Sequence, residues 1–141
     1  MLTFYHAPWS RSSNVLWLME ELGLPYELVE HTRGPDFRSP PSLYEAHPLG
    51  KAPAVEVDGR VMVESSAIIE YIVDRHGGGK LLPPEDQRAE YLEWLHFAEG
   101  SAMPPLLLQL VFERVATAPM PFFAKPIAKA IAAKVMSSFV M

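Results

Sequence analysis

The distribution of strand-like segments along the chain constrains its fold more than any other feature. Short apolar segments typical of β-strands occur only before residue 76. A segment rich in glycine and proline follows, HGGGKLLPPEDQ (residues 76–87), and beyond it the apolar residues recur only at helical spacing. The sequence therefore predicts an α/β domain over residues 1–80 and an all-helical domain over residues 85–141.

The first domain is predicted to begin with a β-α-β unit. Leu2–His6 and Tyr26–Glu30 are strand-like, and between them, from Asn14 onward, apolar residues recur at the spacing of one helix face. Gly23 is expected to cap this helix, and Pro25 prevents its continuation. Such a unit favours a right-handed crossover and a parallel strand pair.

A β-hairpin and a helix complete the predicted α/β domain. Residues 31–47 are expected to form a loop or a short irregular helix. The segments Ala54–Val57 and Val61–Val63 flank an Asp-Gly turn signal, and a helix is predicted from Ser65 to the glycines at 77–79. The order β-α-β-α-β-β-α is that of a thioredoxin-like domain.

The second domain is predicted to consist of helices separated by proline-rich breaks. One helix begins near Glu85, a second covers Leu106–Val115 and a third covers Phe122–Val140. Pro104-Pro105 is expected to break or kink the chain between the first two, because proline lacks the N–H donor and clashes with the preceding turn. The chain ends on apolar residues without a helix stop signal, so we expect an incomplete helical domain.

Composition excludes several classes of site and partner. The chain contains no cysteine, which excludes disulfides, a thiolate nucleophile and zinc-thiolate sites. The five histidines lack the spacing of common metal motifs, so no metal is expected. A net charge of −5 without a basic cluster argues against nucleic acid, and no apolar run approaches the roughly 18 residues of a membrane span. No secretory signal is visible, so we expect a cytoplasmic protein with no membrane partner.

Two short motifs at the ends of the hairpin each have a structural and a functional interpretation. At Ala52-Pro53, the proline can simply open the strand, or a cis peptide bond can turn the backbone groups of Ala52 toward an extended peptide ligand. Glu64-Ser65 can cap the following helix. Alternatively, it can bind the ammonium and carboxylate groups of an α-amino acid, since the first turn of a helix carries partial positive charge.

The loop APWSRSS (residues 7–13) lies between the first strand and the first helix. Its serines, Ser10, Ser12 and Ser13, can cap the helix or donate hydrogen bonds to a sulfur anion, and the helix dipole adds to the second effect. A serine hydrolase is not indicated, because the chain has no GxSxG motif. Without cysteine, any thiol in the chemistry must arrive with the substrate.

Three segments occur in order along the chain: SRSSNVLWLMEELGLPYELV, HPLGKAPAVEVDG and ESSAIIEYI. Together they closely resemble the N-terminal domain of the cytosolic glutathione S-transferases, and in particular a serine-type bacterial and fungal branch. The resemblance is strong from residue 1 to about residue 82 and looser beyond residue 85. It implies an enzyme that activates the glutathione thiol for attack on small apolar electrophiles and that can also reduce peroxides. The alternative is a non-catalytic module of the same kind that binds glutathione or a protein partner.

The resemblance also implies roles for individual residues in glutathione binding. Pro53 corresponds to the family's cis-proline, and Ala52 pairs its backbone with the cysteinyl part of glutathione. Glu64 and Ser65 hold the amino and carboxylate groups of the γ-glutamyl part. Lys51 is placed to meet the glycyl carboxylate as a point charge.

The catalytic hydroxyl of serine-type members corresponds to Ser10 as first choice and Ser12 as second, with Tyr5 in the first strand as a third. It would lower the pKa of the glutathione thiol by a hydrogen bond to the sulfur. Glutathione is then the co-substrate, no metal is needed, and the family leads us to expect a homodimer.

A pocket for the electrophile is expected from the same resemblance, lined by Trp9, Met103 and Leu107. The leucine-rich segment 102–112 either lines this pocket or packs into the core of the helical domain. Trp9 stands where the branch has small polar residues, and its bulk either covers the thiol or contacts the electrophile.

Overall fold

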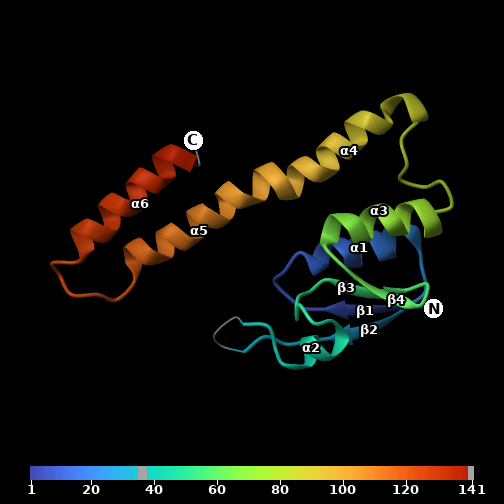
Figure 1. Ribbon diagram of the computed structural model, residues 1–141, viewed down its shortest axis with the longest axis horizontal. Helices are drawn as coiled ribbons and strands as arrows, with labels where there is room; N and C mark the ends of the chain where they lie inside the picture. The colour runs from blue at the N-terminus through green and yellow to red at the C-terminus, as the bar shows by residue number, and fades with distance from the viewer. Residues whose placement is uncertain (35–37, 140–141) are drawn as a thin grey trace. The chain divides into compact units, whose positions relative to one another are not determined.

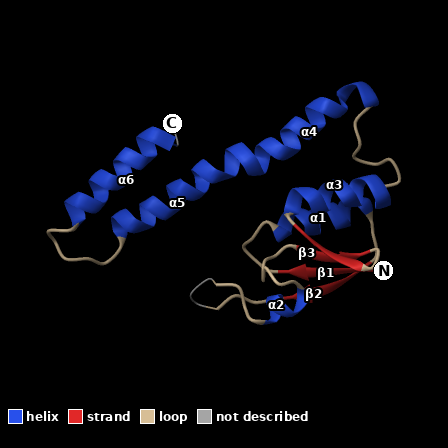
Figure 2. Ribbon diagram, viewed as in Figure 1, coloured by secondary structure: helices blue, strands red, loops and turns tan. Residues whose placement is uncertain are grey.

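The computed structural model describes residues 1–34 and 38–139 of the chain. These residues form two compact units, the first ending at Pro84 and the second beginning at Glu85. The first unit is a sheet with helices, and the described part of the second unit is helical (Figures 1 and 2). The predicted fold class, a thioredoxin-like domain followed by a helical one, is confirmed.

A mixed four-stranded sheet organises the first unit, in the order β2-β1-β3-β4. Its strands are β1 (Leu2–His6), β2 (Tyr26–Glu30), β3 (Ala54–Val57) and β4 (Arg60–Val63). β1 and β2 are parallel, as the predicted β-α-β unit requires, whereas β3 is antiparallel to both β1 and β4. The strand bounds match the predicted ones, except that β4 begins one residue earlier.

Helices cover both faces of this sheet. α1 (Ser12–Leu22) and α3 (Ser65–His76) pack beside each other on one face, and the short helix α2 (Ser42–Ala46) lies on the other side (Figure 1). α1 begins at Ser12, two residues before the predicted start, and ends as predicted. Gly23 has φ +66°, and its N–H donates to the carbonyl of Glu20 at 3.0 Å.

The core of the first unit lies between the sheet and the α1–α3 layer. Along β1 the residues alternate, with Leu2, Phe4 and His6 buried and Thr3 and Tyr5 partly exposed. The buried cluster consists of Leu2, Phe4, Val15, Leu18, Met19, Leu22, Val55, Val57, Ile68, Ile72 and Val73. Strands with period-two burial and helices with one apolar face therefore meet in a single layer of side chains.

The second unit contains one long helical segment and a further helix. A short 3-10 turn (Glu85–Gln87) leads into α4 (Arg88–Phe97), a π-helical stretch η2 (Ala98–Ala102) and α5 (Met103–Thr117). α6 (Lys125–Phe139) then packs against α5. The last helix was predicted to reach Val140, which lies outside the described residues.

Of the predicted break or kink at Pro104-Pro105, the break does not occur. The chain stays helical there, and the prolines are the second and third residues of α5, which follows η2 directly. At those positions a missing N–H costs little, because the first N–H groups of a helix have no partner four residues back. The wider hydrogen-bonding ring of η2 gives the proline rings room without ending the helical course.

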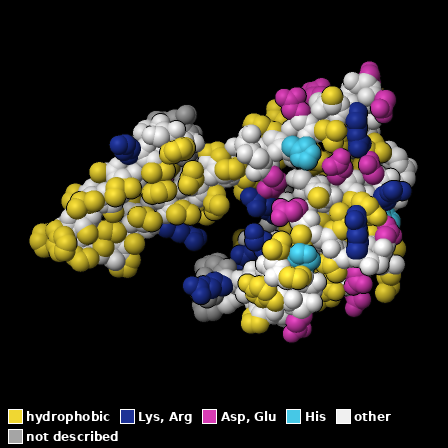
Figure 3. All heavy atoms as spheres, in the orientation of Figure 1, with side chains coloured by type: hydrophobic (Ala, Val, Ile, Leu, Met, Phe, Trp, Pro, Cys, Tyr) yellow, Lys and Arg dark blue, Asp and Glu magenta, His cyan; other side chains and the backbone are white. Residues whose placement is uncertain are grey.

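The described helices of the second unit expose large apolar side chains, many of them on α5 and α6 (Figure 3). On α6, Ile127 and Ile131 lie outside the packed face, since their side chains are more than half exposed while Ala132 is buried. None of the helices in the described ranges is long and apolar enough to cross a membrane.

We expect Ile72→Ala to lower the free energy of unfolding by about 2 to 5 kcal/mol, because Ile72 is fully buried in the core cluster and truncation leaves a cavity. Ile131→Ala is the matched control, with a side chain 52 % exposed, and should cost less than about 1 kcal/mol. Urea denaturation of both variants measures the difference. Equal losses would contradict the core described above.

Candidate functional site

Backbone pairing brings together the segments that carry the predicted site. Tyr5 on β1 pairs with Ala54 on β3, and Ala54 pairs with Val63 on β4. Three segments leave the sheet at this row: the loop after β1, the residues that precede β3, and the Glu64-Ser65 step into α3. Since neighbouring strands are about 5 Å apart, the three segments start within about 10 Å of one another.

The loop after β1 is held in place by hydrogen bonds between two of its serines and the buried backbone groups of Ala7. Ser12 Oγ accepts a hydrogen bond from the N–H of Ala7 at 3.1 Å and lies 2.8 Å from its carbonyl oxygen. Ser10 Oγ donates to the same carbonyl at 2.7 Å, and the two serine oxygens are 2.7 Å apart. Ala7 and Ser12 are both fully buried. These contacts satisfy polar groups that would otherwise be costly to bury.

The two serines differ in what a ligand can reach. Ser12 is 0 % exposed and is used internally, whereas Ser10 is half-buried at the surface. Each hydroxyl has a single proton to donate. If Ser10 turned its proton toward a ligand, Ser12 could still donate to the carbonyl of Ala7, so that buried oxygen would keep a partner. This arrangement favours Ser10 over Ser12 as the ligand-facing hydroxyl.

Tyr5, the third candidate, faces a carboxylate. Its hydroxyl donates to Glu56 Oε2 at 3.4 Å. Burial raises the pKa of Tyr5, and the negative charge of Glu56 raises it further. A phenol that donates to a neighbouring carboxylate is less suited to stabilising a second anion.

The segment before β3 has the backbone geometry that the functional interpretation requires. The Ala52–Pro53 peptide bond is cis, which confirms the predicted isomer. Pro53 is buried, Ala52 is half-buried and Lys51 is exposed. Gly50 has φ +57°, and a Cβ at this position would overlap the ring of Tyr44, so the approach to Lys51 requires glycine. The sequence analysis did not identify Gly50, although a glycine before the Lys-Ala-Pro segment was a visible signal.

The start of α3 combines an exposed carboxylate with a mostly buried serine. Glu64 is exposed and has φ +72°, a region that residues other than glycine rarely adopt. Its carbonyl accepts the N–H of Ile68 at 2.9 Å, which starts the helix. Ser65 is 6 % exposed, while Ser66, which the sequence analysis did not single out as a site residue, is half-buried. The start of α3 thus presents two kinds of charge: partial positive charge on the first N–H groups of the helix and negative charge on the Glu64 carboxylate.

The residues predicted to bind an electrophile lie in different units. Trp9, on the loop before α1, is 93 % exposed and has φ +58°. Met103 is half-buried at the start of α5, and Leu107 on the same helix is 53 % exposed. A pocket lined by these residues therefore stays a prediction.

Buried histidines beside the candidate site were not predicted from the sequence. His6, the last residue of β1, is 7 % exposed, and its burial lowers its pKa, partly opposed by Glu30. His31 is 8 % exposed, and its Nδ1 lies 2.8 Å from Ser42 Oγ, which ties the segment after β2 to α2. Among the described residues, no group of three or more acidic, histidine or cysteine side chains could hold a metal ion.

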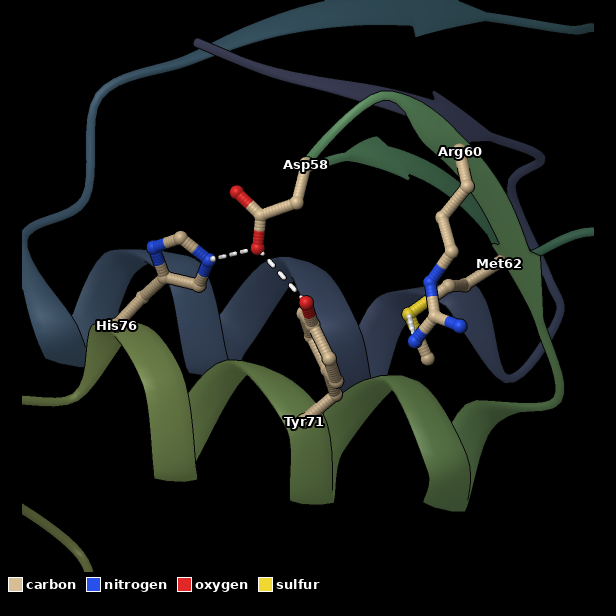
Figure 4. A network of polar contacts seen from close by, with 5 residues as sticks. All are labelled: Asp58, Arg60, Met62, Tyr71 and His76. Atoms are coloured by element: carbon tan, nitrogen blue, oxygen red, sulfur yellow. Dashed lines mark hydrogen bonds and ion pairs between the residues drawn. The ribbon is translucent and has the colours of Figure 1, made fainter.

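A polar network fastens the other end of the hairpin (Figure 4). Tyr71 donates to Asp58 Oδ2 at 2.8 Å, and His76 Nε2 lies 3.5 Å from the same oxygen. The hydrogen bond from Tyr71 is the main reason why the pKa of Asp58 is lowered. The guanidinium of Arg60 lies 5.0 Å from the centre of the Tyr71 ring. These contacts join the turn of the hairpin to α3, whose first residue belongs to the candidate site.

Comparison with known proteins identifies the family. The family described as "Glutathione S-transferase, N-terminal domain" matches residues 4–80. The chain is 33 % identical over 138 residues to glutathione S-transferase 1 of Saccharomyces cerevisiae and 41 % identical over 107 residues to glutathione S-transferase 3 of Schizosaccharomyces pombe. These matches cover 92 % and 74 % of the chain. The chain therefore belongs to the glutathione S-transferase family.

Solved structures agree with this assignment. A glutathione S-transferase from Actinobacillus pleuropneumoniae superposes with a TM-score of 0.71 at 28 % identity, covering 97 % of this chain and 63 % of the other. A glutathione transferase from Phanerochaete chrysosporium, solved with oxidized glutathione, gives a TM-score of 0.67 at 23 % identity over 96 % of this chain and 64 % of the other, a likeness of fold alone. The chain spans 59 % and 43 % of the lengths of the two yeast relatives.

We expect the burial of His6 to make the protein less stable in mild acid. A histidine whose pKa is lower in the folded state binds its proton more readily when unfolded, so its stabilising contribution is complete above its unfolded pKa and is lost as the pH falls through the folded pKa. The slope contributed by one such group is at most about 1.4 kcal/mol per pH unit. Urea denaturation between pH 7.5 and 5 measures it. His6→Asn should flatten the curve, whereas the exposed control His96→Asn should leave it unchanged; identical curves for all three proteins would contradict the prediction.

Proposed function

We propose that this chain binds glutathione at the end of the sheet defined by the Tyr5–Ala54–Val63 row and activates its thiol for transfer to small apolar electrophiles. The observation that carries the proposal is the convergence there of a cis Ala52–Pro53 bond, an exposed carboxylate at Glu64 and a half-buried hydroxyl at Ser10. Each feature alone has a structural explanation. Their presence in one family domain and at one end of one sheet supports a common ligand.

Glutathione would lie extended along this end of the sheet. The γ-glutamyl ammonium would pair with Glu64, and its carboxylate with the first N–H groups of α3 at Ser65. The cysteinyl backbone would pair with the backbone of Ala52, as an added strand does. Lys51, exposed next to Ala52, would meet the glycyl carboxylate. The pairing partners of the peptide are thus backbone groups and opposite charges.

The reaction requires a thiolate. The Ser10 hydroxyl would donate a hydrogen bond to the thiolate sulfur, and the positive end of α1 would favour the negative charge. A decrease of about two units from a thiol pKa near 8.5 corresponds to roughly 2.7 kcal/mol. The thiol proton passes to water, the sulfur forms a bond to the electrophilic carbon, and the leaving group departs with the electron pair of the broken bond.

Finer features of the proposal follow from the family. We propose a cytoplasmic homodimer that needs no metal, an electrophile pocket lined by Trp9, Met103 and Leu107, and a capacity to reduce peroxides. Apolar side chains exposed on α5, such as Leu107 and Leu110, are compatible with a pocket or with contact to another copy.

A non-catalytic glutathione-binding module is the second candidate. It is favoured by the exposed bulk of Trp9 next to Ser10. Such a module would keep the binding set around Ala52 and Glu64 but would not turn over an electrophile.

Retention on immobilised glutathione tests binding directly. We expect the protein to be retained and to elute with free glutathione. Lys51→Ala should weaken glutathione binding about threefold to tenfold in calorimetry, because it removes one partly solvated ion pair. Lys80→Ala, an exposed lysine of the linker, is the control and should bind normally. Lack of retention, or equal weakening by both substitutions, would contradict the proposed binding mode.

Truncation of Ser10 and truncation of Ser12 should have different effects on the protein. Ser10→Ala should raise the pKa of bound glutathione by about one to two units and lower kcat/KM about tenfold to a hundredfold at neutral pH, with little loss of stability. Ser12→Ala should lower the free energy of unfolding by about 1 to 3 kcal/mol, because it leaves the buried N–H of Ala7 without its acceptor. Thiolate absorbance against pH and urea denaturation measure the two effects, with the exposed Ser13→Ala as control. Loss of thiolate in Ser12→Ala alone would assign the role to Ser12.

A further inference from the structure

A cavity lies at the end of the sheet opposite the candidate glutathione site. Its volume is about 180 Å³, and its apolar lining comes from the start of β1, the segment before β2 and the end of β3: Met1, Leu2, Leu24, Pro25 and Val57. Two polar residues, Asp58 in the hairpin turn and His76 at the end of α3, complete the lining. Because β1 has five residues, its length separates this cavity from the candidate site by about 13 Å.

His76 brings an unsatisfied polar atom to the cavity. Its Nε2 is buried and makes no hydrogen bond to any of the residues that the structure describes, although Asp58 Oδ2 lies 3.5 Å away (Figure 4). Buried polar atoms nearly always have a hydrogen-bond partner. An unsatisfied atom on a residue that lines a cavity therefore marks a position for a polar group of a ligand.

Asp58 supplies a negative charge whose orientation is already set. Its Oδ2 accepts a hydrogen bond from the hydroxyl of Tyr71 at 2.8 Å, whereas Oδ1 has no hydrogen bond or ion pair in the described part of the chain. The hydrogen bond from Tyr71 is also the main cause of the lowered pKa of Asp58, so the carboxylate is charged at neutral pH. No lysine or arginine is among the described residues that line the cavity. The polar end of the cavity therefore favours a cation.

We propose that this cavity is a second ligand site, which binds a compact ring carrying an ammonium group. The ring would lie against the apolar lining, and the ammonium would pair with Asp58 Oδ1. In the tautomer that is protonated at Nδ1, His76 Nε2 would accept a second N–H of the ammonium.

The size of the cavity and the rigidity of its polar end fit such a ligand. An apolar cavity of roughly 150 Å³ accommodates benzene, so a volume of about 180 Å³ holds one ring with a short arm. Because Tyr71 already orients the carboxylate, little freedom of Asp58 is lost when the ligand binds. The site is separate from the candidate glutathione site, and the inference does not depend on the proposed transferase activity.

Benzylamine, which at neutral pH is a benzene ring with a one-carbon arm and an ammonium group, is the probe. Its titration should give saturable changes in the amide NMR shifts of Leu2, Leu24 and Asp58, with a Kd of about 1 to 10 mM. Benzyl alcohol, which has the same ring without the charge, should bind about threefold to tenfold more weakly. Methylamine, which has the charge without the ring, should give no saturation. Added glutathione should leave the Kd of benzylamine unchanged.

Asp58→Asn removes the charge and preserves the turn. Asparagine tolerates the φ of +50° at this position, and an Asn-Gly pair favours the same tight turn. Its amide oxygen can still accept the hydrogen bond from Tyr71. Benzylamine should bind this variant about threefold to tenfold more weakly than the parent, and no more tightly than benzyl alcohol. Asp86→Asn, which removes an exposed carboxylate of the second unit, is the control and should bind benzylamine as the parent does.

Saturable shifts at the cavity, together with a preference for the ammonium probe that Asp58→Asn abolishes, would support the proposal. It is overturned by shifts that do not saturate, by equal binding of benzylamine and benzyl alcohol to the parent, or by an equal loss in Asp86→Asn. Displacement of benzylamine by glutathione would place the probe in the candidate glutathione site and would also overturn it. The comparison of the two ring probes uses the parent protein, so it is decisive even if Asp58→Asn does not fold.

Discussion

The pairing of β3 with strands on both sides is the interaction on which the candidate site depends. Ala54 is fully buried and is paired with Tyr5 on one side and Val63 on the other. Side chains in a strand alternate between faces, so a slip of one residue in this register would turn the buried face of β3 outward. It would also displace the Pro53 segment relative to Glu64. The register that builds the core is therefore the register that assembles the site, and neither can change without the other.

The site also depends on a division of roles between neighbouring serines. Ser12, fully buried, anchors both polar groups of Ala7, so the start of α1 is fixed relative to the end of β1. Ser10 shares that network but remains partly accessible. The Ser10 hydroxyl can turn to a new partner at little free-energy cost, because the buried carbonyl of Ala7 would keep Ser12 as a hydrogen-bond donor. In the proposed function, stability and reactivity would thus depend on different atoms that lie 2.7 Å apart.

Local signals were sufficient to predict most of the first unit. The Asp58-Gly59 turn has positive φ at both residues, as a tight hairpin turn requires, and Gly23 ends α1 in the left-handed conformation. What the sequence could not provide were the effects of burial and of backbone hydrogen bonding on individual residues. In the sequence, Ser10 and Ser12 are equally good candidates. They are distinguished only in the structure, where Ser12 is buried with its hydroxyl bonded to the backbone of Ala7. In the sequence, Pro104 likewise signals a break. The helix continues past it because of the π-helical hydrogen bonding in the preceding turn, which the sequence pattern does not indicate.

Backbone strain has an uneven distribution that bears on function. Among the residues that the structure describes, four other than glycine have positive φ. Asp58 is explained by its turn, and Leu81 lies in the linker after α3. The other two, Trp9 and Glu64, belong to segments that leave the sheet at the same end, next to Ser10 and Ser65. Each such residue costs on the order of 1 to 3 kcal/mol, which packing elsewhere must offset. The core between the sheet and the α1–α3 layer is where that offset is available, so the strain at the site is sustained by the pairing and packing of the same four strands.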